Sequence, residues 1–107
     1  EYVPHFLAQG ATAILCASDG IARGVLAELR RLGLRVPGDV SVMGYDDLPL
    51  AAGCEPPLTT IRQDRLALGK SAFSLRDSLM NGVAVSKVLL RPQLIVREST
   101  GPAPVRK

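Results

Sequence analysis

Two polar pairs, each placed directly after an apolar run, are the positions where this sequence could do chemistry. Ser18-Asp19 follows residues 11–17 (ATAILCA), and Asp46-Asp47 follows residues 40–44 (VSVMG). Such runs are typical of buried parallel strands, and open parallel sheets bind ligands outside the carboxyl ends of their strands. If the two strands are neighbours, Ser18 and Asp46 meet at that edge. Their oxygens suit the hydroxyl or amine donors of a small polar ligand.

The same residues also have a purely structural interpretation. Asp19 could cap a helix and Asp46-Asp47 could begin a loop, without any ligand. Catalysis has weaker support, because Ser18 has no nearby base and the only histidine, His5, lies beyond a loop and a strand. No glycine pattern of a phosphate-binding loop is present. We therefore expect a protein that is not an enzyme.

The residues between the two polar pairs predict a βαβ unit. Ala22, Val25, Leu26 and Leu29 recur at the spacing of one helix face, and Gly33 stands where a left-handed C-terminal cap belongs. The helix therefore joins two strands over residues 11–44, and such a crossover gives parallel strands.

The second half of the chain continues the alternation of predicted strands and helices. Residues 45–57 predict a loop with a helical turn over 48–53, and residues 58–62 predict a third strand. Asp64 would cap a helix with an apolar stripe, and Asn81-Gly82 would end it. Residues 88–96 predict a last extended segment that Pro92 interrupts. The stripe consists of Leu68, Ala72, Leu75 and Leu79.

Composition limits the other function classes. The 107 residues are 47% hydrophobic and 21% charged, as in globular domains, and no apolar run approaches the roughly 20 residues of a membrane span. The net charge of +3 is dispersed, which favours solvated surfaces over a nucleic-acid footprint. Cys16 and Cys54 form no disulfide framework, and with His5 they are too few for a zinc site. We expect no metal, no cofactor and a cytoplasmic location.

Five segments in order resemble the lactose/galactose repressor (LacI/GalR) family. They are residues 18–22 (SDGIA), 32–47 (LGLRVPGDVSVMGYDD), 56–63 (PPLTTIRQ), 68–69 (LG) and 94–100 (LIVREST). The resemblance covers most of the chain. It implies an α/β fold, the C-terminal portion of a type I periplasmic-binding-protein-like domain, with a parallel sheet flanked by helices. The chain would cross between two subdomains.

The resemblance also implies a function. Members of the family are dimeric transcription regulators, in which a sugar or purine-like effector binds between the subdomains and alters operator affinity allosterically. Operator DNA is bound through a helix-turn-helix headpiece that the matched region does not include. We therefore expect that this chain alone does not bind operator. Missing neighbours would also leave apolar faces bare.

Four residues correspond to the family's effector site. Asp46 matches the acidic residue after Gly-Tyr that hydrogen-bonds the effector, and Ser18 matches a position that often carries Asn. Gln63 matches a cleft residue where the chain crosses between subdomains. Arg65 is expected to face the same cleft and to suit an anionic or hydroxyl-rich ligand, although a solvated residue at a helix start is an equal alternative.

The resemblance further assigns subdomains and a dimer surface. Residues 11–61 and 88–100 would form the C-terminal subdomain, and residues 62–82 a helix of the N-terminal one. The dimer surface would include Arg23 and Ala27, together with the loop from Ala51 to Cys54, although Arg23 could equally face water. A solute-binding protein of a sugar transport system, with the same fold, and an unrelated α/β enzyme remain the alternatives.

Overall fold

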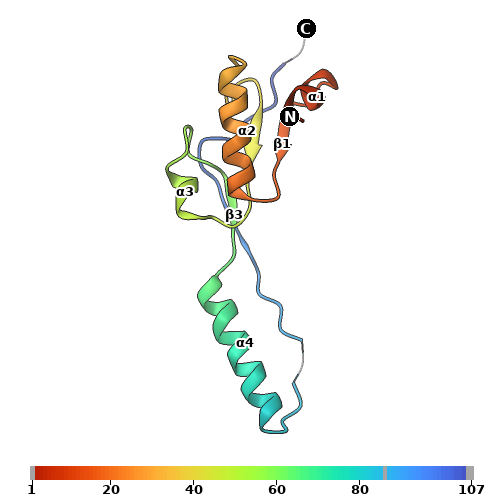
Figure 1. Ribbon diagram of the computed structural model, residues 1–107, viewed down its shortest axis with the longest axis vertical. Coiled ribbons are helices and arrows are strands. Elements are labelled where there is room, and N and C mark those ends of the chain that lie inside the picture. The colour runs from red at the N-terminus through yellow and green to blue at the C-terminus, as the bar shows by residue number, and fades with distance from the viewer. Residues whose placement is uncertain (1, 86, 106–107) are drawn as a thin grey trace. The chain divides into compact units, whose positions relative to one another are not determined.

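The computed structural model describes residues 2–85 and 87–105, and it divides into two compact units (Figure 1). The first unit contains Glu1–Arg62 and Leu94–Lys107, and the second contains Gln63–Gln93. In chain order the elements are α1 (Val3–Ala8), β1 (Ala13–Leu15), α2 (Asp19–Arg31), β2 (Ser41–Met43), α3 (Pro49–Ala52), β3 (Thr60–Arg62), α4 (Arg65–Met80) and β4 (Gln93–Ile95).

The first unit is built on the predicted βαβ crossover. β1 and β2 pair in parallel, with Ile14 opposite Val42, and α2 packs on β2. One apolar core joins the strands to the helix because Val42, Leu29 and Leu58 are fully buried. The α/β fold class predicted from the sequence is confirmed.

Both ends of α2 follow local sequence signals. Ser18 is the N-cap, and its Oγ accepts a hydrogen bond from the Ile21 amide at 3.2 Å. At the other end Gly33 has φ +74°, and the Leu34 amide donates to the Leu29 carbonyl at 2.9 Å. This is the hydrogen-bond pattern of a Schellman cap, which favours glycine because the position is left-handed.

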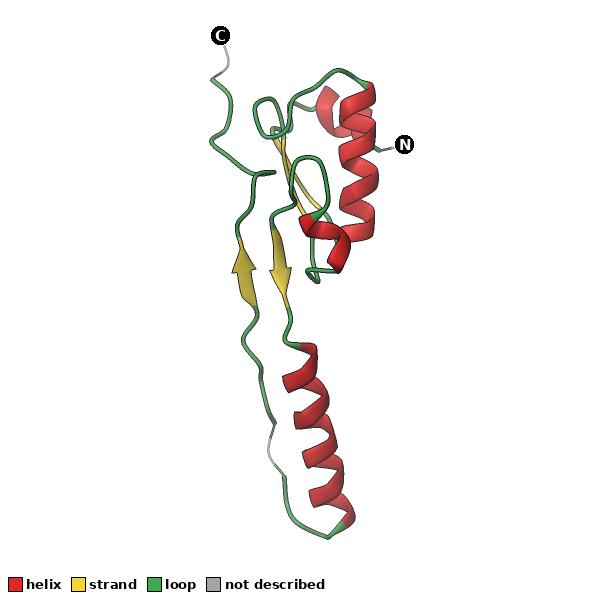
Figure 2. Ribbon diagram, turned by 90° about the vertical axis from the view of Figure 1, so that its left-hand side faces the viewer, coloured by secondary structure: helices red, strands yellow, loops and turns green. Residues whose placement is uncertain are grey.

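A second small sheet consists of β3 and β4, whose arrows run in opposite directions in Figure 2. Parallel bridges from Met43 to Thr59 and from Asp46 to Arg62 join the β2 segment to the β3 segment. The extended segment predicted over residues 88–96 forms a strand only after Pro92, which has no amide hydrogen to donate. The short α1 was not predicted from the sequence.

In the second unit, α4 begins where the sequence predicts. Asp64 caps it, with Oδ1 accepting from the Ala67 amide at 2.9 Å. No residue of α4 is buried. Within the predicted apolar stripe Leu68, Ala72 and Leu79 are exposed and Leu75 is half-buried, and Phe73 beside the stripe is 65% exposed. No helix in the described part of the chain combines the length and the hydrophobicity that crossing a bilayer requires.

Candidate functional site

The carboxyl ends of β1 and β2 lie side by side. The Cys16 amide donates to the Met43 carbonyl at 2.8 Å, and the Asp19 amide donates to the Tyr45 carbonyl at 3.0 Å. These bonds place the loops that carry Ser18 and Asp46 next to each other at one edge of the sheet. Both residues are half-buried. The edge therefore holds a hydroxyl and a carboxylate on adjacent loops, the chemistry expected from the sequence.

Ser18 has a structural role in addition to any contact with a ligand. Its Oγ accepts the Ile21 amide and so satisfies one of the donors at the start of α2. A serine hydroxyl has two acceptor lone pairs and one hydrogen to donate. The cap uses one lone pair, which leaves the hydroxyl hydrogen able to donate to a ligand oxygen.

Asp46 stands on an unusual backbone. Its φ is +112°, and the next residue, Asp47, has φ +55°. Residues other than glycine rarely adopt positive φ, and they persist there only where surrounding structure imposes it. One such restraint is the Asp46 amide, which donates to the Ile61 carbonyl at 2.8 Å.

Asp19 does not cap α2 with its side chain. It is fully buried, and its Oδ1 accepts the Thr60 hydroxyl at 2.6 Å while Oδ2 accepts the Leu48 amide at 2.7 Å. The helix-cap interpretation of Asp19 is therefore wrong, because Ser18 supplies the cap and Asp19 turns inward. Gly44 leaves the room for this carboxylate, since a Cβ there would collide with Oδ1.

The sequence predicted no specific contact for the side chain of Asp47. Its side chain is only 8% exposed and forms ion pairs at 2.7 Å with both Arg62 Nε and Arg97 Nη2. Arg97 also donates from Nη1 to the Leu58 carbonyl at 2.9 Å. Burial alone would raise the pKa of Asp47, but the hydrogen bonds and charges of Arg97 and Arg62 outweigh it and hold the pKa below its ordinary value.

Gln63 and Arg65 belong to the second unit. Gln63 is half-buried and directly follows β3, and Arg65 is the exposed first residue of α4. The crossing of the chain into the second unit therefore begins at the position where the resemblance places a cleft residue. A role for either side chain in effector binding stays a prediction.

The expected dimer surface can be located within the first unit. Arg23 and Ala27 are exposed on one face of α2, which packs against α3. Burial raises the pKa of the Cys54 thiol, and the charge of Arg23 opposes that rise. Ala51 is fully buried within the first unit, and its place in a dimer surface stays a prediction.

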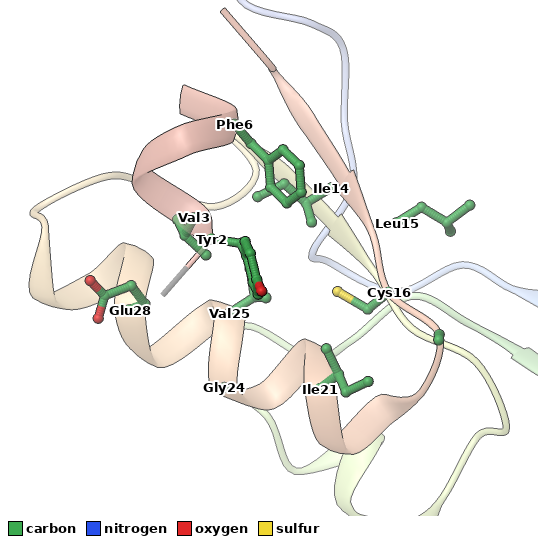
Figure 3. Close-up of a pocket in the computed structure, with 11 residues that line it drawn as sticks. Tyr2, Val3, Phe6, Ile14, Leu15, Cys16, Ile21, Gly24, Val25 and Glu28 are labelled. Carbon is green, nitrogen blue, oxygen red and sulfur yellow. The ribbon is translucent and has the colours of Figure 1, made fainter. Parts of the chain in front are cut away.

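A groove of about 490 Å³ lies between α1, β1 and α2 (Figure 3). Its walls are mostly apolar, with Phe6, Leu15 and Ile21 among them, and Glu28 is the charged side chain among the described residues that line it. Such a lining does not provide the several polar groups that a hydroxyl-rich ligand requires. The groove is thus a poorer candidate for the effector than the edge at Asp46. Across residues 2–85 and 87–105, no group of three or more metal-binding side chains comes together.

Comparison with known proteins places the chain in a family. Residues 3–100 match the periplasmic binding protein-like domain family. The regulator MalR of Streptomyces coelicolor is 45% identical over 95 residues, which are 87% of this chain and 28% of that protein. The repressor CytR of Escherichia coli is 42% identical over 100 residues, which are 92% of this chain and 29% of that protein. The chain thus spans less than a third of the length of these relatives.

Solved structures agree with the sequence match. The transcription regulator CcpA of Lactococcus lactis superimposes with a TM-score of 0.87 at 27% identity, over 94% of this chain and 38% of that one. The Lac repressor dimer bound to operator and the anti-inducer ONPF gives a TM-score of 0.84 at 39% identity, over 92% of this chain and 35% of that one.

These matches show that the chain is an α/β domain of the periplasmic-binding-protein-like class. Within that class, the chain belongs to the LacI-type family of transcriptional regulators. The resemblance and the fold class expected from the sequence are both confirmed. The relatives are regulators rather than enzymes, which agrees with the absence of a nucleophile–base pair in the sequence.

Proposed function

We propose that this chain is the effector-binding and dimerisation region of a cytoplasmic LacI-type transcriptional regulator. The effector is a small hydroxyl-rich molecule, a sugar or a purine derivative with sugar-like donors. The observation that carries the proposal is the placement of Asp46. Its loop is fixed at the carboxyl edge of the β1–β2 sheet, beside the loop of Ser18, where parallel sheets bind ligands.

The chemistry of the edge supports this class of ligand. A carboxylate has two acceptor oxygens and can receive two hydroxyl hydrogens at once, while the Ser18 hydroxyl can donate to a ring or glycosidic oxygen. Bonds to an ionised acceptor are stronger than neutral ones. By the resemblance to the family, Gln63 and Arg65 would also contact the effector, through an amide and a cation.

The regulator would act as a homodimer. The dimer surface would include Arg23, Ala27, Ala51 and Cys54. Operator DNA would be bound only through a helix-turn-helix segment outside the matched region. Effector binding between subdomains would shift the equilibrium between two global states with different operator affinities. A solute-binding protein of a sugar transport system is the alternative, but the relatives with 42–45% identity are transcriptional regulators of the HTH type.

A thermal-shift screen of the full-length protein tests the proposal. The panel would contain hexoses, disaccharides, sugar phosphates, nucleosides and purines. A ligand that binds only the folded state raises the melting temperature by mass action. Asp46→Asn is the decisive variant, because asparagine tolerates positive φ while its side chain loses the charge. We expect the shift to disappear in Asp46→Asn.

The matched control is Asp39→Asn, which alters a half-buried carboxylate of the same unit that pairs with Arg35 at 3.2 Å. This variant should keep the shift. A shift retained at full size in Asp46→Asn would show that the effector binds elsewhere, and the groove beside α1 would then be the next site to test.

A further inference from the structure

Asp46 is fixed by its neighbours rather than by its own conformational preference. The backbone amides of Asp46 and of the next residue, Asp47, both donate hydrogen bonds to the β3 segment. The Asp46 amide donates to the Ile61 carbonyl at 2.8 Å, and the Asp47 amide donates to Thr60 Oγ1 at 3.3 Å. Thr60 in turn donates to the buried Asp19. The loop is therefore tied to β3 through its backbone.

The side chain of Asp47 adds a second tie of a different kind. One carboxylate oxygen accepts from Arg62 and the other from Arg97, each at 2.7 Å. Arg62 is the last residue of the first unit before the chain crosses into the second, and Arg97 follows the return of the chain by three residues. One carboxylate therefore holds both crossing segments of the chain to the loop that carries Asp46.

We propose that Asp47 is a positioning residue for effector binding: by bridging Arg62 and Arg97 it maintains the left-handed backbone that presents Asp46 to the ligand. This inference rests on the proposed function, because it concerns the contact that Asp46 makes. The Asp47 side chain is 8% exposed, and its carboxylate accepts hydrogen bonds from two guanidinium groups. These bonds fix the carboxylate in one orientation. Asp47 is the residue of this loop to which Arg97 donates, at 2.7 Å, so its loss would release Arg97 from the loop.

The first test needs no ligand. Amide hydrogen exchange would be measured residue by residue on the full-length protein, with Asp47→Asn and Asp47→Ala beside the wild type. We expect the amides of residues 46 and 47 to exchange about tenfold faster or more in both variants, the scale of losing a charge-assisted hydrogen bond. The Ile21 amide, held by Ser18, should not change and reports that each variant is folded. Equal exchange rates at residues 46 and 47 would overturn the proposal.

The second test separates positioning from general stability. Sucrose and inosine, one disaccharide and one nucleoside, would be titrated against the wild type, Asp47→Asn, Arg97→Lys and the control Asp39→Asn. A probe that binds the wild type should bind Asp47→Asn and Arg97→Lys about tenfold more weakly, although both keep Asp46, and should bind Asp39→Asn normally. Unchanged affinity in Asp47→Asn would overturn the role of Asp47. If neither probe binds the wild type, the choice of effector class fails and the exchange measurement still decides the inference.

Discussion

At the scale of single residues, the two adjacent aspartates after β2 have different environments. The Asp47 side chain is paired with Arg62 and Arg97. Asp46 is half-buried and itself has a positive φ. A buried charge is tolerated where its partners compensate the loss of water. The pairing of Asp47 with two arginines thus permits two adjacent carboxylates at the end of β2.

The acid stability of the protein should depend on Asp47. Its pKa is held below the ordinary value of 3.8 in the folded state, so the folded state binds fewer protons than the unfolded one as the pH falls. The stabilisation by this group is full above about pH 4 and is lost as the pH falls through the folded-state pKa. We expect the difference in urea midpoint between wild type and Asp47→Asn to shrink as the pH is lowered from about 5 to about 3.

Asp39→Asn is the comparison for this experiment. Its ion pair with Arg35 is exposed, and exposed pairs contribute little to the free energy of unfolding. The hydrogen bonds from Arg35 also lower the pKa of Asp39, so the difference in midpoint between wild type and Asp39→Asn should follow the same trend with pH but stay much smaller than for Asp47→Asn. A gap between wild type and Asp47→Asn that does not change with pH would show that the carboxylate charge is not what stabilises this loop.

At the scale of elements, local signals made α2, α3, β3 and α4 predictable. Each depends on residues close in sequence, such as the Ser18 cap three residues from the Ile21 amide. The network at the site was not predictable in this way, because Thr60 lies 41 residues from Asp19 and Arg97 lies 50 residues from Asp47. Only the tertiary fold brings those partners together. Asp46 was a candidate from its position directly after a predicted strand, and the likeness of whole segments to a family supported that choice over a purely structural role.

Two glycines of the α2 region should respond oppositely to alanine. Gly33 has φ +74°, so Gly33→Ala forces a side chain into the left-handed region and should cost about 1–2 kcal/mol. Gly24 lies within α2 with open space around its position, and Gly24→Ala should stabilise the helix by about 0.5–1 kcal/mol. Urea unfolding followed by circular dichroism would measure both. Equal effects of the two substitutions would contradict the Schellman cap at Gly33.

At the scale of the whole molecule, the two units differ in how they are stabilised. The first has a continuous core that includes Leu29, Val42 and Leu58, whereas α4 of the second buries no residue. A helix of 16 residues is at the margin of stability in water without packing. The exposed apolar residues Leu66, Phe73 and Met80 therefore indicate that α4 needs further protein surface to be stable. The length of the relatives agrees with this interpretation, because they are more than three times as long as the matched region.

Hydrogen exchange on the 107-residue chain and on a form extended to the length of the relatives would test this dependence. We expect the α4 amides to exchange near the rate of an unfolded peptide in the short chain and to become protected in the long one, since packing supplies most helical stability. The amides of α2 provide the internal control, because its buried face is already covered within the first unit and should protect them in both forms. Strong protection of α4 in the short chain at low concentration would mean that the helix is stabilised without additional segments. Protection that appears only as the concentration rises would instead show that a second copy covers the apolar face.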